Sequence, residues 1–168
     1  MYQKRKNKKD ILYILNNLRP EDLHEVKTSR GKNFKKEIPK EIMESNAYFV
    51  LGVEKKTHKA AVMGGCVEAS KGVGLVWLLA TPRALKHKVC LLRHLKKNIE
   101  QFDQKYWVTY NFLWKENKIA KIWLKKFGYR FPAEEENRTF LDNQFLKITN
   151  LPKDFEVFYR LRETRGLA

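Results

Sequence analysis

Hydrophobic and polar positions along the chain form their clearest pattern after residue 73. An apolar run over residues 74–80 is too short to cross a membrane and is bounded by Thr81-Pro82. Such a run predicts a buried strand. Over residues 83–105 the apolar positions then recur at steps of three and four, which places them on one face of a helix. The two segments together predict a strand followed by an amphipathic helix.

The next two segments repeat this order. Residues 106–114 are rich in aromatic and β-branched side chains and predict a second strand. Asn117 suits a helix N-cap, and Gly128 suits the position just after the end of the helix that follows. A strand–helix–strand–helix order over this length predicts that residues 74–80 and 106–114 run parallel.

The remaining periodic segments predict shorter elements on either side of this unit. They are residues 11–15 (strand), 20–31 (helix), 40–44 (helix), 47–53 and 60–69 (paired strands) and 154–165 (helix). We therefore expect an α/β (α+β) fold, with a mixed, mainly antiparallel central sheet that contains one parallel pair and is flanked by about four helices. The expected organisation is a basic flexible arm over 1–9, a single domain over 10–150 and a helical extension over 151–168.

Composition sets the class of protein. The 168 residues are 43% hydrophobic, which is enough for one domain with a sizeable core. The two cysteines, Cys66 and Cys90, lack the spacing of metal ligands, so we expect free thiols and no metal site. No signal peptide and no membrane span is expected.

Charge adds a candidate partner. The formal net charge is +16, from 35 basic and 19 acidic residues. A field of this sign attracts polyanions, and the alternative is a solvated basic surface without a dedicated partner. Double-stranded DNA, bound without sequence preference, or an acidic protein partner is expected. The candidate residues are Lys4, Arg5, Lys6, Lys8, Lys9, Arg93, Lys96, Lys97, Lys118, Lys121, Lys125 and Lys126.

Two segments carry a family resemblance. Residues 117–129 (NKIAKIWLKKFGY) resemble the Asn-x-x-Ala…Lys-x-Gly-Phe segment of the GNAT acetyltransferase superfamily. Residues 76–82 (VWLLATP), followed by a basic helix, are similar to the GNAT-like proteins of tailed phages, among them the internal virion protein A group. The resemblance runs from about Leu18 to Ile148 and implies the GNAT fold.

The resemblance also implies where acetyl-CoA would bind. In active GNAT enzymes it lies between the fourth and fifth strands, and a glycine-containing loop at the start of the following helix holds its pyrophosphate. Glycines there permit close backbone approach, and free N–H groups bind the phosphates. The loop falls on residues 83–88, which contain no glycine. If acetyl-CoA binds, the expected contacts are Leu79, Thr81, Arg83, Lys86, His87, Lys88 and Asn117.

Two further positions depart from the GNAT pattern. Many of these enzymes place a tyrosine seven residues after the helix asparagine, where it protonates the leaving thiolate. Counting from Asn117 gives Leu124, which cannot donate a proton. The strand 74–80 contains no carboxylate or histidine, which leaves Glu68 as the nearest candidate base. No catalytic residue is assigned.

Two functions from different classes follow. The first is a catalytically degenerate GNAT-like phage protein, in the virion or the host cytoplasm, that needs no cofactor and uses its basic surface to bind DNA or acidic virion proteins. The second is an active acetyl-CoA-dependent N-acetyltransferase that acts on an amine of a protein or small molecule. An interaction module that binds no nucleic acid is a third possibility.

Overall fold

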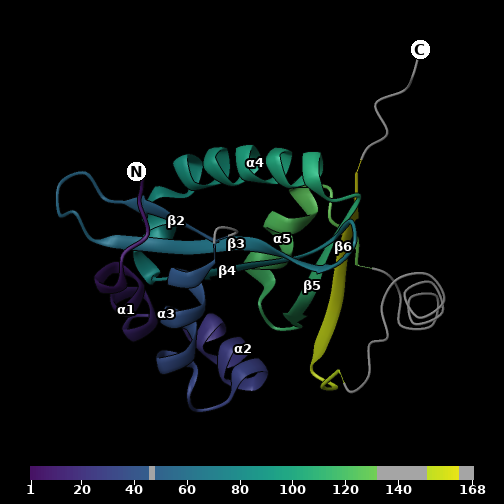
Figure 1. Cartoon of the computed structure of the whole chain (residues 1–168), viewed down its shortest axis with the longest axis horizontal. Coiled ribbons are helices and arrows are strands. Elements are labelled where there is room, and N and C mark those ends of the chain that lie inside the picture. Colours follow the sequence, from purple (N-terminus) through teal and green to yellow (C-terminus); the bar gives the residue numbers. More distant parts are fainter. Residues whose placement is uncertain (46–47, 132–150, 163–168) are drawn as a thin grey trace. The chain divides into compact units, whose positions relative to one another are not determined.

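The computed structural model describes residues 1–45, 48–131 and 151–162 (Figure 1). No helix in these ranges is long and apolar enough to cross a membrane. In chain order, the elements are β1 (Tyr2–Lys4), α1 (Lys8–Asn16), α2 (Pro20–Arg30), α3 (Phe34–Glu44), β2 (Tyr48–Val53), β3 (Ala60–Ser70), β4 (Val73–Ala80), the 3₁₀ helix η1 (Pro82–His87), α4 (Lys88–Lys105), β5 (Val108–Trp114), α5 (Lys118–Lys126) and β6 (Phe155–Leu161).

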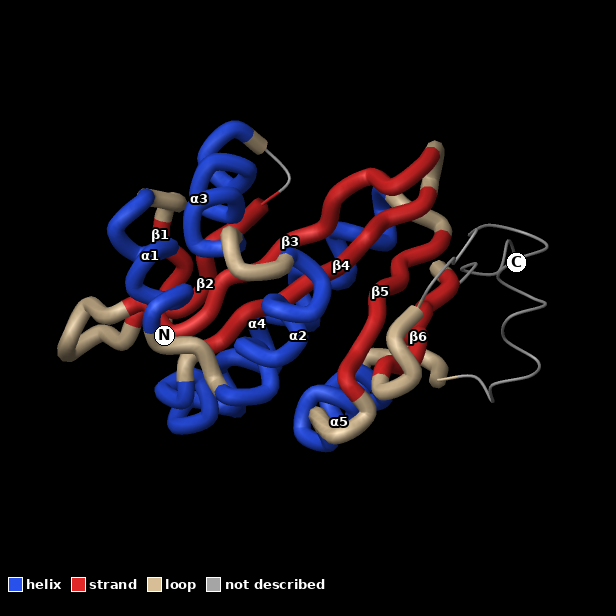
Figure 2. The backbone as a smooth tube through the Cα atoms, turned by 90° about the horizontal axis from the view of Figure 1, so that it is seen from below, coloured by secondary structure: helices blue, strands red, loops and turns tan. Residues whose placement is uncertain are grey.

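The strands are hydrogen-bonded in the order β1-β2-β3-β4-β5-β6 (Figure 2). The β1–β2, β2–β3 and β5–β6 pairs are antiparallel, and β4–β5 is parallel. Two residues connect β3 to β4, a connection that joins only antiparallel neighbours. The expected fold, a mixed and mainly antiparallel sheet with one parallel pair, is confirmed.

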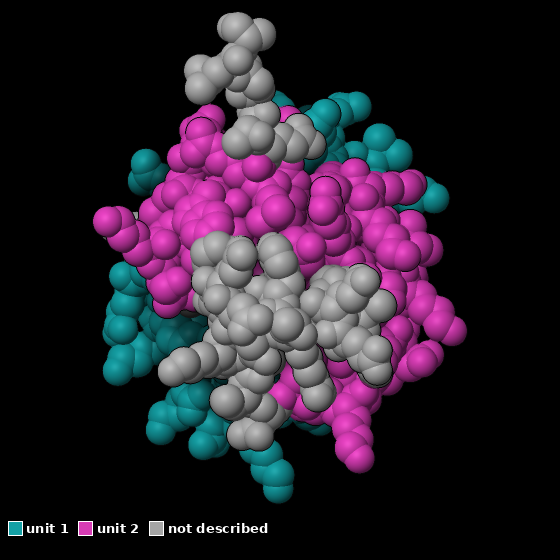
Figure 3. All heavy atoms as spheres, turned by 90° about the vertical axis from the view of Figure 1, so that its right-hand side faces the viewer, with its two compact units in different colours: residues 1–67, 76–98 teal, residues 68–75, 99–168 magenta. Residues whose placement is uncertain are grey.

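Contacts divide the chain into two compact units (Figure 3). Unit 1 comprises residues 1–67 and 76–98, and unit 2 comprises residues 68–75 and 99–168. Strands β3 and β4 and helix α4 each contribute residues to both units.

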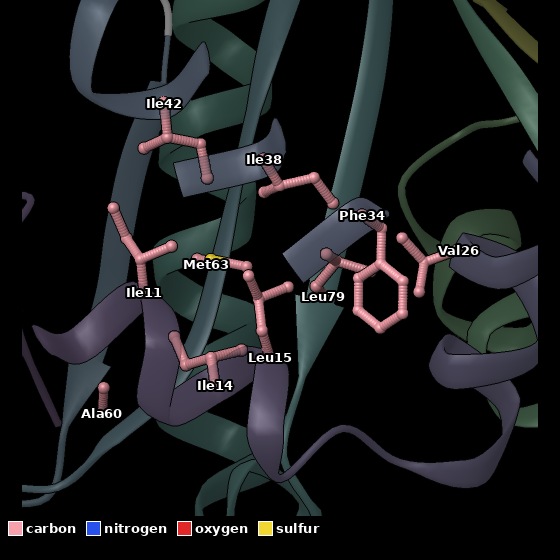
Figure 4. Packing of buried hydrophobic residues seen from close by; sticks show 10 residues of the cluster. All are labelled: Ile11, Ile14, Leu15, Val26, Phe34, Ile38, Ile42, Ala60, Met63 and Leu79. Atoms are coloured by element: carbon pink, nitrogen blue, oxygen red, sulfur yellow. The ribbon is translucent and has the colours of Figure 1, made fainter. Parts of the chain in front are cut away.

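The core of unit 1 is formed by α1, α2 and α3 against β3 and β4. Ile11, Ile14 and Leu15 of α1 are at most 1% exposed and pack with α3 residues and with Met63 of β3 (Figure 4). Leu79 of β4 belongs to the same cluster. Burial on this scale stabilises the unit by about 1.5–3 kcal/mol for each large aliphatic side chain. The helical layer therefore fixes the end of β4 from which the candidate site is built.

The core of unit 2 lies around the β5–β6 pair. These strands are in register from Val108 opposite Leu161 to Trp114 opposite Phe155. Tyr110 and Tyr159 pack with valines of β4 and β5 in one cluster. Burial raises the pKa of the Tyr110 hydroxyl, so this side chain stays protonated and packs as an apolar ring.

The strand expected over residues 11–15 is wrong, because these residues lie in α1. The amide oxygen of Asn7 accepts a hydrogen bond from the Asp10 N–H at 2.9 Å and caps the helix. Ile11, Ile14 and Leu15 then share one buried face at helical spacing. A short apolar run does not distinguish strand from helix by period, and the cap decides the outcome.

Both chain ends also differ from expectation. The helix expected over residues 154–165 is wrong, because β6 occupies Phe155–Leu161 and pairs with β5 along its whole length. The last residues of this prediction, 163–165, lie outside the described part of the chain. Residues 2–4, placed in the flexible arm, form β1 and pair with β2. The β-rich sequence Phe-Glu-Val-Phe-Tyr is the signal that identifies β6 as a strand.

Candidate functional site

The candidate site of unit 1 is built on the end of β4. The parallel ladder with β5 consists of Val73–Val108, Gly74–Thr109 and Leu75–Tyr110. Strand β4 runs five residues further, to Ala80, and leads through Thr81 into η1 and α4. The end of this strand and the start of this helix are the segment to which the sequence assigns acetyl-CoA binding.

Thr81 closes β4 rather than opening a binding site. Its N–H donates to the Ala61 carbonyl at 2.8 Å, and its hydroxyl donates to the same oxygen at 3.1 Å. Its side chain is 1% exposed. Because both donors are engaged inside the fold, Thr81 has a structural role, and Leu79, which was expected beside it at the site, packs into the core cluster.

The backbone of Ala80 is bonded to the start of α2. Its carbonyl accepts from the Arg19 N–H at 2.9 Å, and its N–H donates to the Asp22 carboxylate at 2.7 Å. Arg19 and Asp22 also form a two-point ion pair, with nitrogen–oxygen distances of 2.5 and 3.1 Å. Burial raises the pKa of the Asp22 carboxyl, while Arg19 and the Ala80 N–H act in the opposite direction. This buried pair therefore holds the end of β4.

Sequence reasoning missed this pair. The signal was the segment Arg19-Pro20-Glu21-Asp22, in which a cation and an acid stand three residues apart across a helix start. In the sequence alone, Glu21 and Asp22 fit equally well as acids that interact favourably with the dipole at a helix start.

Arg83 and His87 of η1 share one carboxylate. Arg83 forms an ion pair with Glu54, and His87 Nε2 lies 3.3 Å from the other oxygen of the same carboxylate. The Thr57 hydroxyl donates to Glu54 at 2.5 Å. Three hydrogen bonds lower the pKa of the Glu54 carboxyl to about 2; the bond from Thr57 has the largest effect, and those from Arg83 and His87 have smaller ones. Two of the side chains expected to meet phosphates, Arg83 and His87, therefore have an internal anionic partner.

Stability at low pH is expected to depend on Glu54. Its pKa is about 2 in the folded protein, against an ordinary value of 4.5. The ionised carboxylate therefore stabilises the fold above pH 4.5, and the contribution is lost as the pH falls toward 2. Glu54→Gln should lower the thermal midpoint of unfolding near neutral pH. The difference in midpoint between the variant and the parent protein should become smaller as the pH falls. A difference that stays the same at every pH would show that ionisation of Glu54 does not stabilise the fold.

Lys86 and Lys88 remain available for a ligand. Both are exposed, and neither forms an ion pair within the described residues. They stand where η1 passes into α4, whose first turn contains no acid. A cation in the first turn of a helix is unfavourable by about 0.3–1 kcal/mol. Because α4 continues directly from η1, the positive charge that fits a phosphate group here is that of the two lysine side chains.

The expected residues of unit 2 have structural roles. Asn117 is 2% exposed and caps α5 by accepting from the Ala120 N–H at 3.3 Å. Gly128 ends this helix with φ of 79°. Tyr129 is 4% exposed, and its hydroxyl accepts from Thr109 at 3.2 Å. Tyr129 therefore packs inside unit 2.

The candidate base is exposed to solvent. The Glu68 side chain is 48% exposed and lies 3.5 Å from the Lys105 ammonium. An exposed pair of this kind contributes little to stability. The described residues contain no group of acids, histidines and cysteines that could hold a metal ion.

The expected polyanion-binding residues fall into three sets. In the first nine residues, the Lys6 ammonium donates to the Ile42 carbonyl at 2.8 Å and to the Ser45 carbonyl, and so caps the end of α3. Arg5, Lys8 and Lys9 are exposed, and Lys4 lies in β1. On α5, Lys121 pairs with Glu156 at 2.6 Å, Lys118 lies 3.6 Å from Glu116, and Lys125 and Lys126 are exposed. On α4, Arg93, Lys96 and Lys97 are exposed.

Comparison with known proteins gives the fold. No family model matches the chain, and no curated protein matches it. Solved structures do match: an acetyltransferase of the GNAT family from Staphylococcus aureus Mu50 aligns with a TM-score of 0.65 and 12% identity over 96% of this chain and 98% of that one. The chain has the GNAT fold.

Two further structures of this fold carry named activities. An aminoglycoside 6′-acetyltransferase type Ii aligns with a TM-score of 0.59 and 12% identity over 99% of this chain and all of that chain (100%). A variant of spermidine N-acetyltransferase from Vibrio cholerae aligns with a TM-score of 0.56 and 13% identity over 96% and 95% of the two chains. The likeness therefore extends over whole chains at low identity, which places the fold and leaves the substrate to the site.

Proposed function

We propose that the protein is an acetyl-CoA-dependent N-acetyltransferase. The observation that carries the proposal is the whole-chain likeness to several acetyltransferases. The site adds a strand, β4, that continues past its parallel ladder into a positively charged helix start. Acetyl-CoA would supply an acetyl thioester, whose carbonyl carbon an unprotonated amine attacks with release of the CoA thiolate. Incubation with acetyl-CoA and a panel of amines, followed by thiol release, tests the activity.

The residues present fit acetyl-CoA in one respect and not in another. Lys86 and Lys88 are exposed cations at a helix start and suit its phosphates. The backbone N–H groups of Ala80 and Thr81 are already bonded within the fold and offer no donors. Phosphate binding is therefore assigned to the side chains of Lys86 and Lys88.

Reversing the charge of these two lysines tests that assignment. Lys86→Glu/Lys88→Glu is expected to weaken acetyl-CoA binding at least tenfold, which corresponds to about 1.4 kcal/mol. The matched control is Lys36→Glu/Lys40→Glu, which makes the same charge change at exposed positions of α3. Calorimetric titration compares the two variants. Equal losses in both would assign the effect to net charge rather than to the helix start.

A non-catalytic GNAT-fold protein is the second candidate. The occupied backbone groups of Ala80 and Thr81 and the internal pairing of Arg83 and His87 favour it. Its association with a phage virion stays a prediction from the sequence, which mass spectrometry of purified virions tests. A protein that releases no thiol and binds no acetyl-CoA would favour this candidate.

A further inference from the structure

Helix α4 presents a surface of one sign within unit 1. Arg93, Lys96 and Lys97 are exposed, and no Asp or Glu occurs between residues 88 and 99. None of these three cations forms an ion pair with another described residue. We call these three residues the α4 row.

Helix α3 of the same unit combines both signs. Helix α3 has Lys35, Lys36 and Lys40 interspersed with acids, and its Glu41 pairs with Arg30 of α2 at 3.1 Å. Helix α5 carries no acid of its own, and its Lys121 is paired with Glu156 of β6. Mixed signs are the ordinary arrangement on a soluble surface. The α4 row departs from it, and helix stability does not explain why, since the first turn lacks the acid that the helix dipole favours.

The row is held on a rigid support. Leu91 is fully buried and Asn98 is 9% exposed on the opposite side of α4, where the Asn98 amide donates to the His94 carbonyl at 2.8 Å. At 1.5 Å per residue, Arg93 and Lys97 are separated by about 6 Å along the helix axis, and the three cations of the row lie on the side of the helix away from Leu91. They therefore form one compact positive cluster that can contact neighbouring phosphates of a strand.

We infer that the α4 row binds the phosphate backbone of double-stranded DNA. The face offers cations and a single exposed aliphatic side chain, Val89, among the described residues of its first turns. A protein partner would favour a more apolar and aromatic centre, whereas phosphates require only positive charge. Because contacts to phosphates carry no sequence information, binding through the row is independent of sequence and falls steeply with salt. This inference does not rest on acetyl transfer.

Fluorescence anisotropy with a labelled 20-base-pair duplex tests it. The test variant is Arg93→Glu/Lys96→Glu/Lys97→Glu, which spares Lys86 and Lys88. The matched control, Lys35→Glu/Lys36→Glu/Lys40→Glu, makes the same change in net charge at exposed positions of α3. The test variant should bind DNA at least tenfold more weakly than the control. The slope of the logarithm of its binding constant against the logarithm of salt concentration should become less steep by roughly 0.9 for each phosphate that the protein no longer neutralises. A neutral version with glutamine at positions 93, 96 and 97 should bind DNA more tightly than the test variant and more weakly than the parent.

Three results would overturn the inference. They are no binding of the parent protein at 50 mM salt, equal losses in the test and control variants, or displacement of DNA by poly-glutamate at equal charge concentration. The last result would assign the row to an acidic protein surface. An unchanged circular dichroism spectrum confirms that each variant is folded. Acetyl-CoA titration of the test variant should match the parent, which separates this result from the outcome for acetyl transfer.

Discussion

Asp22→Ala is expected to lower the free energy of unfolding by about 3–5 kcal/mol. The Asp22 carboxylate is 1% exposed and accepts bonds from both the Arg19 guanidinium and the Ala80 N–H. Its removal leaves a buried cation without a counter-charge and a buried N–H without an acceptor. Urea unfolding followed by circular dichroism measures the change.

The neighbouring acid gives the control. Glu21 follows the same proline at the start of α2 and is half-buried, so Glu21→Ala should change stability by about 0.5 kcal/mol or less. The double variant Arg19→Met/Asp22→Leu should be more stable than Asp22→Ala, because it removes both buried charges together. An Asp22→Ala protein as stable as Glu21→Ala would show that the pair does not hold the end of β4.

Ile14→Ala is expected to cost about 2–5 kcal/mol of stability through the cavity it leaves. Ile14 is fully buried in the cluster that joins α1 to α3 and β3. Ile14→Val removes a single methylene group and should cost about 0.5–1.5 kcal/mol. Chemical denaturation of the three proteins measures the series.

This series also tests the helical assignment of residues 11–15. In a helix, Ile14 lies on the buried face with Ile11 and Leu15, whereas Leu12 is only half-buried. In a strand, Leu12 and Ile14 would share a face. Leu12→Ala should therefore cost clearly less than Ile14→Ala. Equal costs for the two would contradict the helix.

The sequence predicts the elements whose ends carry local signals. Asn117 and Gly128 bound α5 as a cap and a left-handed glycine, and both roles follow from residue type alone. For residues 11–15 and 154–165 the predicted type is wrong because short apolar runs fit both periods. In each case, residues outside the apolar run decide which element forms. For β6 these residues are those of β5, with which it pairs along its whole length.

The sequence predicts where the candidate site lies, but not which of its groups are already bonded within the fold. The basic segment after β4 is evident from the sequence, and the structure places it at the start of α4. The engagement of Arg83 by Glu54, and of Ala80 by Asp22, joins residues 29 and 58 positions apart. No periodicity reports contacts of that separation, so the occupied backbone and the internal ion pair are found only in the folded protein.

Calorimetric titration with acetyl-CoA decides whether the protein takes this substrate. We expect saturable binding with micromolar affinity, about −8 kcal/mol, which falls in the Lys86→Glu/Lys88→Glu variant and is retained in Lys36→Glu/Lys40→Glu. Absence of measurable heat, together with an unchanged thermal midpoint at millimolar acetyl-CoA, would contradict it. The bonded backbone at Ala80 and Thr81 would then mark a GNAT fold that no longer takes this substrate.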